Sequence, residues 1–218
     1  NGTITIGGTI GSAQLKTVTL TAATAINLGG NITLGDIAGG GVTVTGPAVL
    51  TAAVDVDASA NNGTISFSST INNDDSGTAR NLQLDTGAGS ITVSGIIGDV
   101  GNSGTAIGTI DINKTDGTGA ITLAGIGSSS AAGNAGTVDI GNTTTLDLNL
   151  AGDFFTGGVT NYKAEDDDGT GSDENIDITG TTLIKTASSN ITFTDSAIDI
   201  ADGVTLLTIN SGSGNVTL

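Results

Sequence analysis

The sequence predicts an all-β fold, a parallel β-solenoid (β-helix) of about seven coils with roughly 30 residues in each coil. Three observations lead to this prediction. A short aliphatic–polar–aliphatic triplet recurs about every 12 residues, similar longer motifs return at intervals of about 25 to 35 residues, and only 2% of the residues are aromatic. A core built from columns of stacked like residues needs few aromatic rings, whereas an ordinary layered core takes much of its buried area from them.

Each triplet is a candidate strand, because alternation with period two places the aliphatic side chains on one face and Thr or Asp on the other. Glycine, asparagine and serine fill the intervals and supply turn conformations. No window carries a helical pattern of apolar residues, so we expect essentially no helix. In chain order, the expected strands are residues 4–6, 18–20, 32–34, 42–44, 54–56, 65–67, 82–84, 91–93, 110–112, 121–123, 138–140, 146–148, 176–178, 191–193, 198–200, 204–206 and 216–218.

A longer repeat is superimposed on the triplets. It is visible in GTITIGGTIG, NITLGDIAG, GTISFSSTIN, GSITVSGIIG, GAITLAGIGS, SNITFTDSAID and the shorter GNVTL. Such self-similarity indicates stacked coils of two or three short strands. A β-sandwich or barrel is the alternative, since many short strands also suit it. The long period, the single proline and the scarcity of aromatic residues favour the solenoid. The first aliphatic residues of these motifs are Ile4, Ile32, Ile65, Ile91, Ile121, Ile191 and Val216.

Composition also limits the possible functions. The mean hydropathy of +0.20 favours a folded chain. Without histidine or cysteine there can be no Ser-His-Asp machinery, no imidazole or thiolate metal site and no disulfide. The net charge of −17 argues against nucleic acid and anionic membranes as partners. No apolar run approaches the ~18 residues of a membrane helix, so we expect no membrane insertion by this segment. An acidic, cysteine-free chain rich in Thr, Asn and Gly is typical of extracellular or cell-surface proteins of bacteria and archaea.

We expect one solenoid domain over residues 1–218. The chain opens within the same motif with which it closes. An uncovered coil edge pairs readily with further strands, so we expect either a window of a longer repeat protein or a subunit that stacks end to end on copies of itself. Residues 151–175 are expected to form an atypical acidic and aromatic insertion.

The repeats resemble a known class of proteins. The stretch NLQLDTGAGSITVSGIIGDVGNSGTAIGTIDINKTDGTGAITLAGIG is similar to the repeats of large bacterial surface and secreted adhesins of the filamentous-haemagglutinin or autotransporter type. The stretch TGTTLIKTASSNITFTDSAIDIADGVTLLTINSGSGNVTL follows the same pattern. The resemblance implies a right-handed parallel β-helix, a cell-surface setting and no catalytic residues. The acidic insertion departs from the family pattern.

The acidic insertion is the candidate metal site. Asp166, Asp168, Asp173 and Glu174 lie around two glycines and could bring several oxygen ligands to one Ca²⁺ ion. The spacing matches neither an EF-hand nor the nonapeptide calcium repeats. A solvated loop kept polar by its charges is the alternative. No other cofactor is expected.

Aromatic residues gather in the same region. Phe154 and Tyr162 could stack on a sugar, with Asp167 beside them as a further binding residue, because loops on a rigid scaffold often carry binding. The alternative is that the rings pack in the core beneath a widened coil.

An enzyme is not expected. Hydrolysis of a polysaccharide by paired carboxylates would need acids that converge on a groove, together with side chains that hold the sugar. The outward acids at Asp111, Asp139, Asp147, Asp177 and Asp199 are scattered along the sequence. The sequence therefore predicts a non-catalytic structural rod, such as a stalk, sheath or extracellular filament. The alternative is an adhesin segment that binds a host, cell or glycan partner through the inserted loop.

Overall fold

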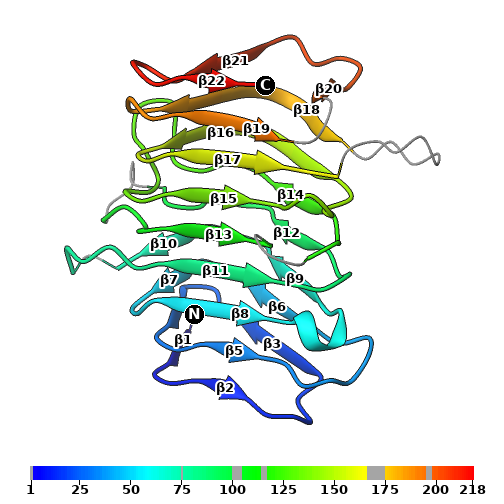
Figure 1. Ribbon diagram of the computed structural model, residues 1–218. Helices are drawn as coiled ribbons and strands as arrows, with labels where there is room; N and C mark the ends of the chain where they lie inside the picture. The colour runs from blue at the N-terminus through cyan, green and yellow to red at the C-terminus, as the bar shows by residue number, and fades with distance from the viewer. Residues whose placement is uncertain (1, 75, 100–104, 114–116, 166–174, 195–197) are drawn as a thin grey trace.

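The computed structural model is a stack of parallel β-coils (Figure 1). The structure describes residues 2–74, 76–99, 105–113, 117–165, 175–194 and 198–218. All strand pairs are parallel, and the coils, of about 25 residues each, make about eight turns. The predicted β-solenoid is therefore confirmed. Among the described residues the one helical element is a 3-10 turn, η1 (Ser59–Asn61).

Each coil visits three faces in turn. Face 2 lies toward the viewer in Figure 1 and is the most regular, with nine strands in an unbroken ladder. Its strands are β2 (Ile10–Gly11), β5 (Ile32–Thr33), β8 (Val54–Asp57), β11 (Leu82–Asp85), β13 (Ile110–Ile112), β15 (Val138–Ile140), β17 (Thr160–Lys163), β19 (Ile191–Thr194) and β22 (Val216–Thr217).

Face 3 follows face 2 along the chain and lies behind it. Its ladder keeps direct register from coil to coil, so that Val18, Val42 and Ile65 stack in one column. Its strands are β3 (Thr17–Thr21), β6 (Gly41–Thr45), β9 (Thr64–Phe67), β12 (Ile91–Val93), β14 (Ile121–Leu123), β16 (Leu148–Thr156), β18 (Ile176–Thr186) and β20 (Ile198–Ile200).

Face 1 closes each coil. It begins with β1 (Thr3–Ile6), β4 (Ala25–Leu28), β7 (Ala48–Leu50) and β10 (Ile71–Asn73), and continues through isolated bridges. The long strands β16 and β18 turn the corner from face 3 into face 1, with a register shift between Leu150 and Gly152, and β21 (Leu207–Asn210) pairs with the second half of β18. One column runs the whole length of face 1: Ile4, Ile26, Ala48, Ile71, Ile97, Ile126, Phe154, Ile184 and Ile209.

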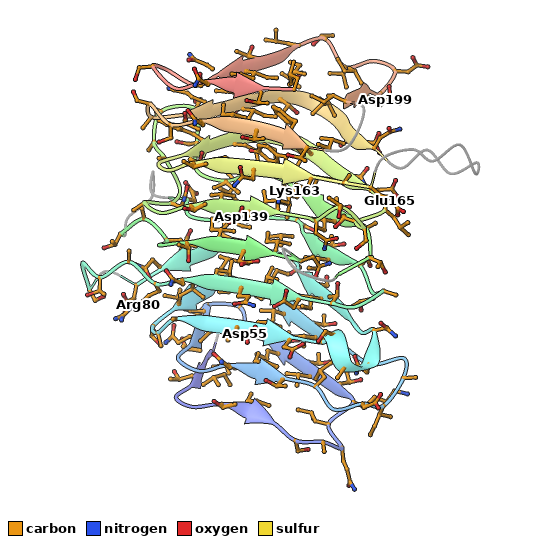
Figure 2. All side chains as sticks on the ribbon, in the orientation of Figure 1. Asp55, Arg80, Asp139, Lys163, Glu165 and Asp199 are labelled. Carbon is orange, nitrogen blue, oxygen red and sulfur yellow. The ribbon has the colours of Figure 1, made fainter. Side chains whose placement is uncertain are left out.

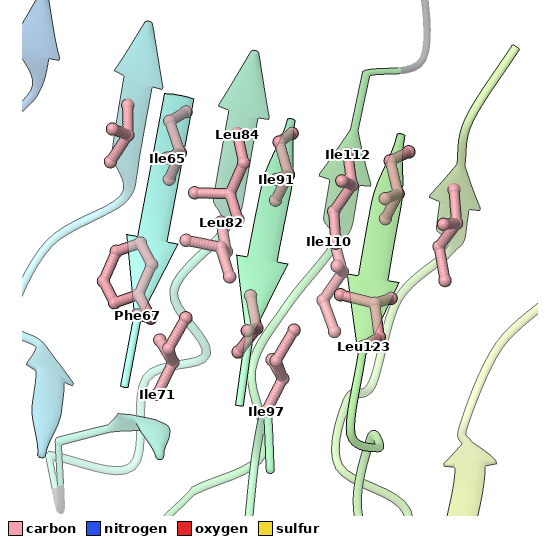
Figure 3. Packing of buried hydrophobic residues seen from close by; sticks show 14 of the residues in the cluster. Ile65, Phe67, Ile71, Leu82, Leu84, Ile91, Ile97, Ile110, Ile112 and Leu123 are labelled. Atoms are coloured by element: carbon pink, nitrogen blue, oxygen red, sulfur yellow. The ribbon is translucent and has the colours of Figure 1, made fainter. Parts of the chain in front are cut away.

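The columns from the three faces meet in one core. Side chains from face 2, such as Leu84 and Ile112, point toward those of face 3, such as Ile65 and Ile91 (Figure 3). All four are 1% exposed or less. Burying an aliphatic side chain of this size contributes about 1.5–3 kcal/mol, and the repetition of this contact in every coil holds the stack together.

The coil length differs from the predicted one. The step is 22 residues from Ile10 to its partner Ile32 and 31 residues from Thr160 to Ile191, so the coils average less than the expected 30 residues and are more numerous. The long motifs also do not share a phase. Ile4 lies on face 1, Ile32 on face 2 and Ile65 on face 3, because the same triplet builds a strand on any face.

Several strands were not marked by the triplet. The segment AVL of β7 has no polar residue at its centre, and INN of β10 and TNYK of β17 lack the aliphatic pair. Two expected strands begin two or three residues before the real ones: residues 146–148 against β16, which begins at Leu148, and residues 204–206 against β21, which begins at Leu207. In both places tertiary pairing with the coil below decides where the strand begins.

Polar side chains tie consecutive coils at the corners. Asn113, which is fully buried and has a φ of 46°, accepts a hydrogen bond from the backbone N–H of Thr86 one coil below (2.8 Å). Asn62 accepts one in the same way from Ala88 (2.8 Å). These side chains satisfy backbone donors that the strands leave unpaired at the bends.

Candidate functional site

The outward side of face 2 carries carboxylates that are stacked from coil to coil. Asp111 on β13 is the register partner of Asp139 on β15, and Asp57 on β8 is the partner of Asp85 on β11. Asp55 and Asp139 appear on this same front face in Figure 2. Partners in a parallel ladder lie about 4.8 Å apart, so each pair brings like charges close together.

Amide side chains lie between the carboxylates. Gln83 Nε2 donates a hydrogen bond to Asp85 Oδ2 (2.6 Å), and Asn161 Nδ2 donates one to Asp139 Oδ1 (2.7 Å). Gln83 is also the register partner of Asp55, and Asn161 is the partner of Asp139. Charge-assisted hydrogen bonds of this kind offset part of the repulsion within the stack.

The pKa of Asp55 is perturbed on this face. Burial, followed by the charges of Asp85, Asp57 and Asp111, raises the pKa of Asp55 to about 6. Its Oδ1 atom is shielded from solvent and accepts no hydrogen bond from the described residues. A buried acceptor without a donor costs free energy, so the charged form of Asp55 is disfavoured in the folded protein.

A shallow cavity of about 320 Å³ opens beside Asp55. It lies where face 1 gives way to face 2, at the start of β8 and β11. Three amides, one carboxylate and a small apolar patch line it: Asn31, Ala53, Val54, Asp55, Asn81 and Gln83. The arrangement can bind a small polar molecule by hydrogen bonds.

The aromatic residues of the predicted site are core residues. Phe154 and Tyr162 are both 0% exposed, and their rings contact each other edge to face with centroids 6.3 Å apart. Stacking on a sugar is therefore wrong for these two side chains, because a buried ring offers no face to a ligand. Both rings pack in the core instead, which is the alternative that the sequence left open. Lys185 covers the neighbouring Phe155, with Nζ 4.2 Å from the ring centroid.

The insertion is narrower than the sequence suggested. Residues 151–163 belong largely to β16 and β17, which keep the register of the coils on either side. The extra length lies in the connection between β17 and β18, residues 164–175, which we call the corner. The equivalent corners at residues 86–90 and 113–120 are shorter.

The predicted calcium ligands Asp166, Asp168, Asp173 and Glu174, together with Asp167, lie outside the described residues. Calcium at this corner stays a prediction. Within the described ranges, no group of three or more acidic side chains has a geometry that could hold a metal ion.

The acids that looked scattered in the sequence are partly stacked. Asp111 pairs with Asp139, and Asp177 pairs with Asp199 across β18 and β20. The cavity beside Asp55 was missed. Its signal was present as Asn31, Asp55 and Asn81 near three strand starts, but one sequence does not reveal which strands are neighbours.

Comparison of the chain with protein-family models, with curated proteins and with solved structures gives no match. Within the described part of the chain, no helix has the length and apolar character needed to cross a membrane.

Proposed function

We propose that the chain is a non-catalytic structural rod of a secreted or cell-surface protein, serving as part of a stalk, sheath or extracellular filament. The observation that carries the proposal is the continuity of the columns. On face 1, nine stacked residues from Ile4 to Ile209 follow one another without a missing level. A core of this kind depends on neighbouring coils alone, so it can lengthen without a change in architecture.

The outermost coil supports stacking on a further coil. Ile200 and Val216 are 49% and 42% exposed, whereas their register partners in the coil below, Ile178 and Ile191, are buried. At the opposite edge, Ile4 and Ile10 are only partly buried. Strand edges that present apolar side chains and unpaired backbone groups favour pairing with another strand. We propose that neighbouring coils, or copies of the chain placed end to end, cover these edges.

A surface setting is supported by composition and by the resemblance to filamentous-haemagglutinin and autotransporter repeats. The chain is acidic, lacks cysteine and is rich in Thr, Asn and Gly. The absence of histidine and cysteine removes the commonest nucleophile–base pairs, in keeping with a non-catalytic role.

An adhesin is the second candidate function. The observation in its favour is the corner at residues 164–175, which is longer than its counterparts in other coils. Long corners on a rigid scaffold are common places for binding. In this function the corner would contact a cell-surface or glycan partner.

Deletion of residues 166–174 separates the two functions. If the chain is a structural rod, the shortened protein keeps its melting temperature and its assembly in electron micrographs, because the ladders do not pass through the corner. Loss of attachment to cells with assembly intact would assign binding to the corner and contradict a purely structural role. A deletion within residues 100–104, in the connection between β12 and β13, controls for the shortening of a connection as such.

A further inference from the structure

We propose that the cavity beside Asp55 on face 2 is a binding site for a single saccharide unit. The proposal adds a ligand site to the rod and does not depend on whether coils stack end to end. It differs from the adhesin function above in its location, because the site lies on β5, β8 and β11 and not at the corner between β17 and β18.

The side-chain oxygens of Asn31 and Asn81 already accept hydrogen bonds within the protein. Asn31 Oδ1 accepts a hydrogen bond from the backbone N–H of Asp55 (3.1 Å), and Asn81 Oδ1 accepts one from the N–H of Thr109 (3.0 Å). These bonds fix the orientation of both amides. The NH₂ groups donate no hydrogen bond to another described residue, so two oriented donors remain for a ligand.

Hydrogen-bond acceptors from Gln83 and Asp55 line the same cavity. Gln83 Nε2 is bonded to Asp85, which leaves Gln83 Oε1 as an acceptor without a partner among the described residues. The Asp55 carboxyl, which also lines the cavity, adds a second acceptor. The cavity therefore presents donors and acceptors together.

This mixture selects the ligand class. A hydroxyl group both donates and accepts, so a molecule with several adjacent hydroxyls can use all four side chains. An ammonium or guanidinium group donates only, and would leave the two asparagine NH₂ groups unpaired. The cavity volume of about 320 Å³ is at the lower end of the range for small-molecule sites, which fits one sugar ring.

The site is preformed and rigid but shallow. Asp55 and Gln83 stand on the paired strands β8 and β11, and Asn31 and Asn81, which directly precede β5 and β11, are held by hydrogen bonds from the backbone. Preorganised groups lose little entropy on binding. No aromatic residue lines the cavity, so a ring cannot stack there and we expect a weak site, with a Kd of about 1 mM for one unit.

The test is a titration of the complete 218-residue chain with glucose, galactose, mannose and N-acetylglucosamine, followed by amide chemical shifts in NMR. We expect saturable shifts at residues 54, 55, 81, 83 and 109 with at least one of the four sugars. Absence of saturable shifts with all four would overturn the proposal.

Two variants locate the site. Asp55→Asn should weaken binding at least tenfold, whereas Asp139→Asn, which removes the same charge from the same face outside the cavity, should change it less than twofold. Equal weakening by both variants would overturn the proposal, because the effect would then come from net charge. If Asp55→Asn does not fold, Gln83→Ala, at an exposed position in the lining of the cavity, takes its place. It should also weaken sugar binding more than Asp139→Asn does.

An arginine amide titration tests the cationic alternative. Asp55 is faced by Asn31, which directly precedes β5, by Gln83 and Asp85 from β11, by Asp57 on its own strand and by Asp111 on β13. Protonation of this group would abolish cation binding at about pH 5, whereas a carboxylic acid still bonds hydroxyls. Binding of arginine amide alone, lost at low pH, would overturn the saccharide assignment.

Discussion

The rings of Tyr162 and Phe193 lie nearly parallel, with centroids 5.2 Å apart and an angle of 15° between their planes. The two residues are register partners on β17 and β19. They continue an inward column of face 2 that is aliphatic in the earlier coils, where Leu84, Ile112 and Ile140 occupy it. The aromatic pair therefore serves as two further levels of the core.

Replacing Tyr162 by Phe should not destabilise the protein. The Tyr162 hydroxyl is buried without a hydrogen-bond partner among the described residues, and burial raises the pKa of this phenol. Removing an unsatisfied buried hydroxyl should raise the free energy of unfolding by about 1 kcal/mol, whereas Tyr162→Ala should lower it by about 3–5 kcal/mol. Urea denaturation measures both. A loss of more than about 1 kcal/mol in Tyr162→Phe would mean that the hydroxyl has a partner.

Close approach between coils is tested at Gly46. This residue has a φ of +119°, and a Cβ atom there would lie 1.9 Å from the carbonyl oxygen of Ala22 in the coil below. Gly46→Ala should therefore lower the free energy of unfolding by about 3 kcal/mol or more. Gly77 also has a positive φ of +77°, but nothing lies within 4 Å of its Cβ position.

Gly77→Ala is the matched control, because it carries the backbone strain without the contact. We expect it to cost about 1 kcal/mol. Equal losses in the two variants would show that conformation alone sets the requirement for glycine, and would contradict the stacking of residue 46 on residue 22.

Mild acid should stabilise the protein through Asp55. Its pKa is raised from 3.8 to about 6 in the folded state, so between these values the folded protein binds a proton that the unfolded chain does not. The free energy of unfolding should then rise as the pH falls from about 7 to about 5. After allowance for solvent screening of this partly exposed group, the gain is about 1 kcal/mol. Asp55→Asn should show no such gain in urea denaturation at the two pH values, and an equal pH response in both proteins would refute the assignment.

Calcium is tested by melting the protein with and without a chelator. If Asp166, Asp168, Asp173 and Glu174 hold Ca²⁺, saturating calcium should raise the melting temperature relative to the chelated protein, because a ligand that binds only the folded state stabilises it. Asn substitutions at Asp166 and Asp168 should remove the difference. If the native chain melts at the same temperature with calcium and with chelator, the prediction of a calcium site is wrong.

The architecture could be predicted because every coil of a solenoid needs the same alternation of buried and exposed side chains. Alternation in triplets such as Ile91-Thr92-Val93 marks a strand, and recurrence with a single proline and few aromatic residues marks stacked coils. The phase of the coils could not be predicted. Ile4 and Ile65 head similar motifs on different faces, and β17 carries a polar sequence that forms a strand only because β15 lies beneath it.

The sites were harder to predict, since they depend on neighbours that are distant in sequence. Tyr162 sits beside an acidic run but is buried, because its own strand points it inward. Asp55 looked unremarkable, but burial, followed by the charges of Asp85, Asp57 and Asp111, raises its pKa, and only the ladder brings Asp85 and Asp111 close to it. Alternation within a strand reveals the inward or outward direction of a side chain but not its partners in the next coil.

Electron microscopy of the purified chain as a function of concentration tests the rod most directly. Eight turns at about 4.8 Å each give a stack about 40 Å tall. We expect particles that grow along the coil axis in steps of about this height, and we expect Ile200→Lys with Val216→Lys to stop the growth without lowering the melting temperature. Single stacks at every concentration, or clusters joined side by side, would contradict a rod built by coil-on-coil stacking.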